Sequence, residues 1–243
     1  MTLLRPIALV VVIAVAAVFG TRMRDAHAST AATPSPAVAA AARTTDAGPV
    51  DTTVDLREHG RGPTVPASAL TGFALPPGYE VPDDPELLPN SPREYRAGYH
   101  EGVDFPLSMN MPVYAAKAGT IVRIDRSYVE WSDEELIAAQ DAAYRLGYTP
   151  PETLDKLRGR QVWIDHGDGV VTRYAHLASV EPISVGSYVT QGTLIGTVGN
   201  SGLKAGPHLH IEIRVGDDYL GEGLSGDELL RVLHRAFSVT PDE

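Results

Sequence analysis

The 243-residue sequence contains no cysteine. Disulfide bonds, a thiol nucleophile and cysteine-ligated metal sites are therefore excluded, so stability must come from the core or from a metal held by other side chains. Cationic side chains are also scarce, because 20 Lys and Arg stand against 31 Asp and Glu and the formal net charge is −11. A chain of this charge is a poor generic ligand for nucleic acid, where phosphate neutralisation dominates affinity. We expect no nucleic-acid partner.

The apolar run near the start of the chain is short. It extends over Ile7–Phe19, which is less than the roughly 20 residues that a comfortable transmembrane helix needs. Arg5 precedes the run and Ala26-His27-Ala28 follows it as a small-x-small cleavage pattern, so residues 1–28 are predicted to be a signal peptide. Charged residues between the run and this pattern keep an uncleaved N-terminal anchor open as the alternative. Either way, we expect the remaining chain to be extracytoplasmic: secreted, periplasmic or tethered to the outside of the membrane.

The composition changes twice before the folded part begins. Residues 29–68 are dominated by Ala, Thr, Pro, Ser and Val without apolar periodicity, which predicts a flexible linker. Residues 69–99 are rich in Pro and acidic side chains, and we expect them to form an irregular arm that packs on the following domain. Residues 100–243 are predicted to form that domain.

Short strands separated by glycine turns dominate the predicted domain. Many such strands indicate a mainly β fold, an antiparallel sheet or sandwich. Residues 225–237 carry apolar side chains at helical spacing and predict a C-terminal helix that packs against the sheet. The predicted strands are Val113–Ala116, Gly119–Asp125, Gln161–His166, Gly169–His176, Ser187–Thr190, Leu194–Gly199 and His208–Val215.

A helical insertion interrupts the strands at about residues 128–158. Ser132 and Glu135 form a capping box before a helical pattern that Gly147 ends, and Thr149-Pro150-Pro151-Glu152 begins a second, short helix. The insertion is either a surface excursion or a wall of a cleft. We hypothesise that it narrows which substrate fits, because it leaves the sheet soon after residues with metal-binding chemistry.

Those residues are histidines and one aspartate. In Gly206-Pro207-His208-Leu209-His210, the two histidines lie two positions apart on a predicted strand, so both side chains project from the same face. His100 and Asp104 lie four positions apart, and His176 ends another strand-like run. Neutral imidazole and carboxylate are the ligands that hold catalytic zinc, usually three from the protein with one position open. This ligand chemistry favours zinc over other divalent ions.

Four motifs occur in the order found in the lysostaphin-type (LytM-type) zinc endopeptidases. They are His100-x-x-x-Asp104, Asp165-His166-Gly167-Asp168-Gly169, Tyr174-x-His176 and Gly206-Pro207-His208-x-His210, within a region from about residue 100 to residue 215. The chain therefore resembles this family of peptidoglycan hydrolases. One departure is the approach to the last motif, which lacks the usual Ser/Thr-rich character in Asn200–Gly206.

The resemblance implies a function and a role for each matching residue. His100, Asp104 and His210 match the zinc ligands, with one Zn²⁺ per chain, and His176 and His208 match the catalytic histidines that do not bind zinc. Either of these two histidines can be the general base. The implied activity is zinc-dependent hydrolysis of peptidoglycan stem peptides or cross-bridges, in which the metal activates a water.

Other interpretations stay open. A catalytically silent wall-binding regulator of another hydrolase would have the same motifs if its site were blocked. The glycine-punctuated segments also resemble biotinyl and lipoyl carrier domains, but Lys117 lacks the hairpin-tip setting that such carriers need. His166 is interpreted as a structural turn residue, and His27, His59 and His234 are assigned no role. The sequence leaves the oligomeric state open.

Overall fold

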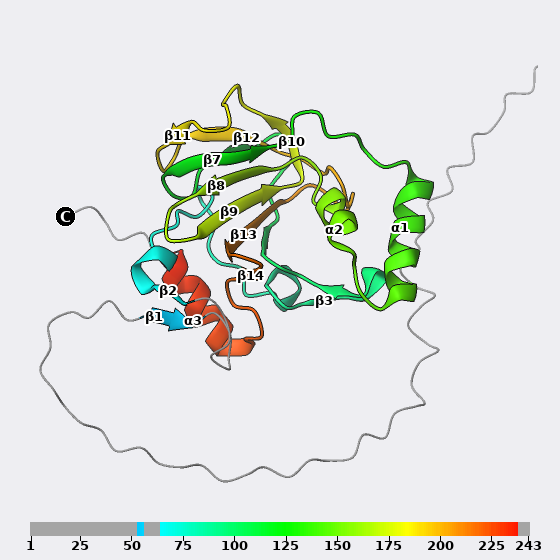
Figure 1. The fold of residues 1–243 in the computed structure, drawn as a ribbon, viewed down its shortest axis with the longest axis horizontal. Coiled ribbons are helices and arrows are strands. Elements are labelled where there is room, and N and C mark those ends of the chain that lie inside the picture. Colours follow the sequence, from blue (N-terminus) through cyan, green and yellow to red (C-terminus); the bar gives the residue numbers. More distant parts are fainter. Residues whose placement is uncertain (1–52, 56–63, 238–243) are drawn as a thin grey trace, which may run out of the picture. The chain divides into compact units, whose positions relative to one another are not determined.

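The computed structural model describes residues 53–55 and 64–237, all within the compact unit of residues 48–243 (Figure 1). The predicted signal peptide, most of the predicted linker, and His27 and His59 lie outside the described residues. None of the helices in the described part is long and apolar enough to cross a membrane.

The main sheet is antiparallel and has seven strands. Its order is β11-β7-β8-β9-β13-β14, and β5 pairs with β13. A second antiparallel sheet has the order β10-β12-β6, so the predicted mainly β, antiparallel fold is confirmed. The strands of the main sheet are β5 (Val103–Phe105), β7 (Gly119–Ile124), β8 (Val162–Asp165), β9 (Val170–Ala175), β11 (Tyr188–Val189), β13 (Leu209–Val215) and β14 (Asp218–Tyr219). Those of the second sheet are β6 (Pro112–Tyr114), β10 (Leu177–Val180) and β12 (Leu194–Val198).

The chain passes from one sheet to the other at His176. This residue follows β9 and precedes β10, and its φ of 59° is in the left-handed region that a non-glycine residue rarely adopts. The two sheets contribute to one apolar cluster, in which Ile121 and Ile164 of the main sheet and Leu177 and Ile195 of the second are completely buried. His176 therefore lies at a corner that is held on both sides by packed strands.

Strand β13 is central and its two faces have different chemistry. Leu209, Ile211 and Ile213 belong to the apolar cluster, whereas the alternate residues His210 and Glu212 are buried polar side chains on the opposite face. Every residue of this strand is buried. The sheet thus supplies a rigid, enclosed floor for polar groups.

Three α-helices accompany the sheets: α1 (Asp133–Leu146), α2 (Pro151–Leu157) and α3 (Gly226–Ala236). The predicted capping box begins α1, because the Ser132 hydroxyl accepts from Glu135 N at 3.1 Å and Ser132 N donates to the Glu135 carboxylate at 2.8 Å. Helix α3 buries Leu229 and Leu233 in the core cluster, as its apolar stripe predicts. The helical insertion and the C-terminal helix of the predicted fold are both present.

Residues 64–99 consist of short elements and connecting segments. Strand β2 (Thr64–Pro66) pairs with β1 (Thr53–Asp55), and β3 (Pro92–Arg93) pairs with β4 (Gly98–Tyr99). The segment also has three 3-10 helices, at Ala67–Leu70, Pro85–Leu87 and Glu94–Arg96. This segment contacts the insertion, because the Thr149 hydroxyl donates to Arg96 O at 2.5 Å and accepts from the Arg96 guanidinium at 3.1 Å. It also covers Lys117, whose ammonium donates to Ala69 O and Thr71 O at 2.9 Å each. This enclosed setting of Lys117 disfavours the carrier-domain interpretation.

Candidate metal centre

His100, Asp104 and His210 meet on the polar face of β13. Asp104 on β5 lies directly opposite His210 in the strand register, and His100 precedes β5 in the chain. Three donor atoms converge: His100 Nε2 is 3.0 Å from both Asp104 Oδ1 and His210 Nδ1, and the last two atoms are 2.8 Å apart. Ala175 pairs with His210 on the other side, where its small side chain leaves room for the imidazole.

In His100 and His210, the ring nitrogen that is not near Asp104 forms a hydrogen bond to an acceptor of the protein. His100 Nδ1 donates to Leu88 O at 2.8 Å, and His210 Nε2 donates to the Glu212 carboxylate at 3.2 Å. A carbonyl or an ionised carboxylate can only accept, so these nitrogens carry the protons when the rings are neutral. The lone pairs of His100 Nε2 and His210 Nδ1 therefore both point at the place where Asp104 Oδ1 lies.

This donor set fits a zinc ion. Two neutral imidazole nitrogens and one carboxylate oxygen are the protein ligands of many catalytic zinc sites. Tetrahedral coordination with normal bond lengths separates such donors by roughly 3.3 Å, close to the distances found between these three atoms. The outer hydrogen bonds to Leu88 O and Glu212 are of the kind that fix the orientation of metal-binding imidazoles.

The ionisable groups of the cluster shift one another's pKa values. Burial alone would raise the pKa of Asp104, but His100 and His210 beside it hold that pKa well below its usual value. Burial also opposes the charged form of His210, yet hydrogen bonds to Asp104 and Glu212 outweigh it and raise the pKa of His210 to about 9. Burial lowers the pKa of His100, which the nearby Asp104 only partly offsets.

We expect the metal-free protein to lose stability as the pH rises through about 9. The pKa of His210 is raised above the unfolded value, so the stabilisation is complete below about pH 6.5 and disappears as the pH passes the folded value of about 9. That difference corresponds to roughly 3 kcal/mol. Urea unfolding with a chelator present, at about pH 6 and about pH 10, measures it. The decrease must be much smaller in His210→Ala, and an equal decrease there would contradict the assignment.

His176 and His208 lie beside the three donors. Their ring centroids are 4.5 Å apart, and His208 Nε2 is 3.7 Å from Asp104 Oδ1. His176 Nδ1 donates to Ser201 O and His208 Nδ1 donates to Gly206 O, each at 2.8 Å, so the lone pair of either ring is on Nε2 when that ring is neutral. Burial, followed by the neighbouring His208, lowers the pKa of His176 to about 3, so this ring is neutral near neutral pH.

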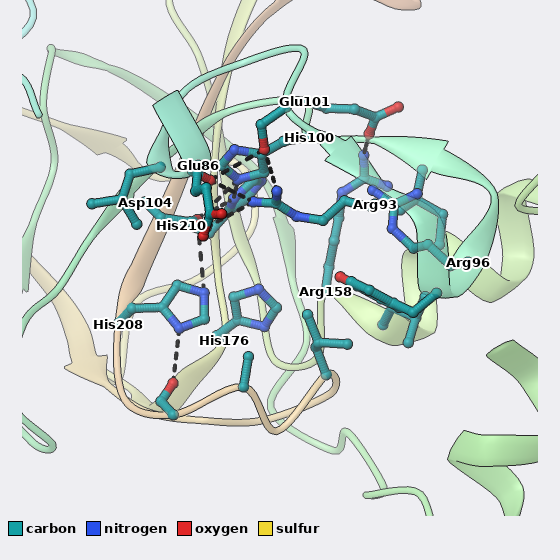
Figure 2. A pocket seen from close by; sticks show the side chains of 18 of the residues that line it. Glu86, Arg93, Arg96, His100, Glu101, Asp104, Arg158, His176, His208 and His210 are labelled. Atoms are coloured by element: carbon teal, nitrogen blue, oxygen red, sulfur yellow. Dashed lines mark hydrogen bonds and ion pairs between the residues drawn. The ribbon is translucent and has the colours of Figure 1, made fainter. Parts of the chain in front are cut away.

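The five residues line a cleft of about 910 Å³ (Figure 2). One wall comes from the arm, including Arg93, whose guanidinium is 3.5 Å from Asp104 Oδ2. Another comes from the insertion, through Gln140 of α1 and Leu154 of α2. The third comes from the loop before His208. The arm, the insertion and this loop therefore all border the cleft that contains the donor atoms.

The loop that departs from the family pattern is held by the insertion. Gly202 N donates to the Glu130 carboxylate at 3.1 Å, and the Lys204 ammonium donates to Trp131 O at 3.0 Å and to Asp133 at 2.8 Å. Within the loop, Gly206 N donates to the Asn200 side chain at 2.9 Å. These contacts fix the loop without the Ser/Thr-rich approach.

Sequence reasoning missed Glu212 and Arg93. Glu212 follows His210 by two positions on the same strand, and this alternation was the available signal for a partner of His210. No local pattern indicated Arg93. His166 lies outside the cluster and binds Ala118 O and the Thr172 hydroxyl at 2.8 Å each, as a structural side chain does, and His234 is exposed on α3.

Comparison with known proteins shows which family the sequence matches. The model of Peptidase family M23 matches residues 98–221, which contain all five residues of the cluster and the insertion. Among curated proteins, peptidoglycan DD-endopeptidase ShyA of Vibrio cholerae is 30% identical over 132 residues, which are 54% of this chain and 24% of that protein. DD-carboxypeptidase/endopeptidase Mpg of Neisseria meningitidis is 31% identical over 116 residues, 48% of this chain and 20% of that protein. The matches thus span about a quarter or less of these relatives.

A solved structure is also similar. The catalytic domain of the antimicrobial peptidase lysostaphin from Staphylococcus simulans is 28% identical, with a TM-score of 0.36, and the match covers 56% of this chain and 80% of that domain.

Proposed function

The chain belongs to peptidase family M23, and from this premise we propose that it is a zinc-dependent endopeptidase that hydrolyses peptide bonds of bacterial peptidoglycan. The observation that carries the proposal is the convergence of His100 Nε2, Asp104 Oδ1 and His210 Nδ1 at the floor of a cleft. The relatives named above, ShyA and Mpg, are described as endopeptidases, and ShyA as one that acts on peptidoglycan.

His100, Asp104 and His210 would hold the metal in this function. When bound, a zinc ion supplies a Lewis acid that activates water near neutral pH. The ligand orientations are already set by Leu88 O and Glu212, so little reorganisation is needed on binding.

His176 and His208 would move the proton. Both residues line the cleft and, when neutral, carry the lone pair on Nε2, so either can accept a proton from the attacking water or, once protonated, donate to the leaving amine. Protonated, they can also stabilise negative charge on the carbonyl oxygen. The hydrogen bonds from their Nδ1 atoms to backbone carbonyls would hold both rings in place during this proton transfer.

The insertion would restrict which peptide enters. Gln140 and Leu154 line the cleft that contains the donor atoms, and we propose that they contact the residues flanking the scissile bond. Leu154→Ala should leave zinc affinity unchanged and alter the set of peptides released. An unchanged product set would remove this part of the proposal.

The location of the chain is also proposed. We infer that residues 1–28 direct it out of the cytoplasm as a signal peptide or anchor, and that residues 29–68 tether the peptidase domain of residues 100–243. Its substrate lies outside the cytoplasmic membrane, which is the reason for this inference.

Digestion of purified cell wall tests the proposal. The zinc-loaded chain should release soluble muropeptides with new free amino groups, detected by mass spectrometry after amine labelling. A chelator should stop the release and added zinc should restore it. Stoichiometric zinc without cleavage would identify a silent regulator instead.

A further inference from the structure

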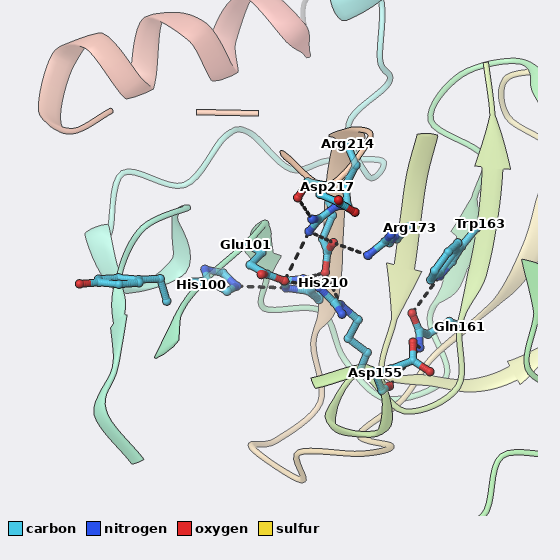
Figure 3. Close-up of polar contacts among 12 residues, drawn as sticks. His100, Glu101, Asp155, Gln161, Trp163, Arg173, His210, Arg214 and Asp217 are labelled. Carbon is cyan, nitrogen blue, oxygen red and sulfur yellow. Dashed lines mark hydrogen bonds and ion pairs between the residues drawn. The ribbon is translucent and has the colours of Figure 1, made fainter. Parts of the chain in front are cut away.

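Glu212 is a completely buried carboxylate behind His210. One of its oxygens accepts from His210 Nε2, and the other is 3.0 Å from the Arg214 guanidinium and 3.5 Å from that of Arg173, the residue opposite Glu212 on β9. Figure 3 labels His210, Arg173 and Arg214. The orientation of His210 thus depends on a carboxylate that is itself held by cations.

Arg158 completes this group from outside the sheet. It is the residue directly after α2, at the end of the insertion, and is 7% exposed. Its Nε donates to Glu212 Oε1 at 2.5 Å, the oxygen that also accepts from His210, and its Nη2 donates to Glu101, the neighbour of His100. The Arg158 guanidinium therefore connects Glu212, which contacts His210, with Glu101, which is next to His100 in the chain.

The backbone of Arg158 reaches the catalytic side as well. Its carbonyl accepts from His176 N at 2.8 Å, at the left-handed corner between β9 and β10. The same turn of chain holds the neighbouring loop, because Arg160 N donates to the Ser201 hydroxyl at 2.9 Å and Ser201 O accepts from His176 Nδ1. The end of the insertion is thereby bonded to supports of His210 and of His176.

We propose that Arg158 is a positioning residue of the metal centre, which acts through Glu212 to hold His210 in its ligating orientation. The inference rests on the proposed zinc function. It makes the insertion part of the site rather than a surface excursion. A guanidinium is needed here because its fork contacts Glu212 and Glu101 at once, whereas an ammonium is a point charge on a flexible stem.

Zinc affinity of the full chain tests this directly. Zinc dissociation constants would be measured by competition with a chromophoric chelator, and the visible spectrum of the cobalt-substituted protein would report ligand geometry. We expect Arg158→Met to weaken zinc binding by about 10-fold, the lower end of the 10- to 100-fold loss that is usual for a direct partner of a ligand, because Arg158 acts through such a partner, Glu212. Arg158→Lys should fall between this variant and the unaltered chain, with a changed cobalt spectrum.

Arg160→Met is the matched control. Arg160 lies two residues further on, and its side chain donates to Leu177 O and Ala178 O rather than to Glu212 or Glu101. It should stay within about twofold of the unaltered chain. In a Glu212→Gln background, Arg158→Met should add less than about twofold, because Arg158 acts through Glu212.

Each result decides the matter. Unchanged zinc affinity in Arg158→Met, an equal loss in Arg160→Met, or full additivity with Glu212→Gln would overturn the inference. Arg214 remains beside both carboxylates when Arg158 is absent, so we expect the variant to fold. If it does not, Arg158→Lys decides by the same measurement, and affinity equal to that of the unaltered chain would overturn the inference. If the chain binds zinc but does not cleave cell wall, the proposed endopeptidase function is refuted and the role of Arg158 is not. If the chain binds no zinc, both are refuted.

Discussion

His210→Ala is expected to lose bound zinc and to reduce wall-peptide cleavage by roughly 10³-fold or more, since a metal centre contributes several kcal/mol to transition-state stabilisation. His210 supplies one of three converging donors and also contacts Asp104 and Glu212. Its removal leaves two donors, too few for a stable catalytic zinc site. Metal content by mass spectrometry and muropeptide release measure the two effects.

The control is the exposed histidine His234 on α3. His234→Ala removes the same side chain from a residue that does not line the cleft, and should keep both zinc and activity. A His210→Ala protein that retains stoichiometric zinc and cleavage would contradict the assignment of His210 as a ligand. Added zinc should not rescue the variant at concentrations that saturate the unaltered chain.

Much of the main sheet could be predicted because its strands alternate visibly. All seven predicted strands are present, with ends that differ by a few residues, and the capping box of α1 and the apolar stripe of α3 are local signals that tertiary packing did not override. Strands β5, β10 and β14 were missed. Strands β5 and β14 have three and two residues, too few for a visible alternation. Strand β10 follows β9 after His176 alone, so the pattern has no turn signal there. The residue at this corner, His176, has the left-handed backbone conformation that usually indicates glycine in a sequence.

The chemistry of the candidate site was visible in the sequence, but its supports were not. His208 and His210 share a short motif, and periodicity places Glu212 on the same face. Arg158 reaches Glu212 from 54 positions away, and Leu88 O reaches His100 from a segment without regular pattern. Contacts of this kind depend on how the arm and the insertion fold back on the sheet, which no local spacing encodes.

His176→Asn and His208→Asn should each keep zinc and lose cleavage. Proton transfer by a positioned histidine contributes about 10²- to 10⁴-fold, and we expect a decrease in kcat of this size. Neither residue is among the three converging donors, so zinc affinity should stay within about twofold. Asparagine is the appropriate replacement because it tolerates the left-handed conformation of residue 176 and can still donate to the carbonyl that holds each ring. Single-turnover cleavage of a wall peptide and chelator competition provide the two measurements.

The double variant separates two modes of action. If both histidines serve one proton-transfer unit, the double variant should be no slower than the slower single variant, because groups that act together are strongly non-additive. If one moves the proton while the other stabilises charge on the carbonyl oxygen, the losses should multiply. The 4.5 Å separation of the ring centroids favours the first result. Loss of zinc in His208→Asn, whose Nε2 is 3.7 Å from Asp104, would instead make His208 a ligand and refute this division of roles.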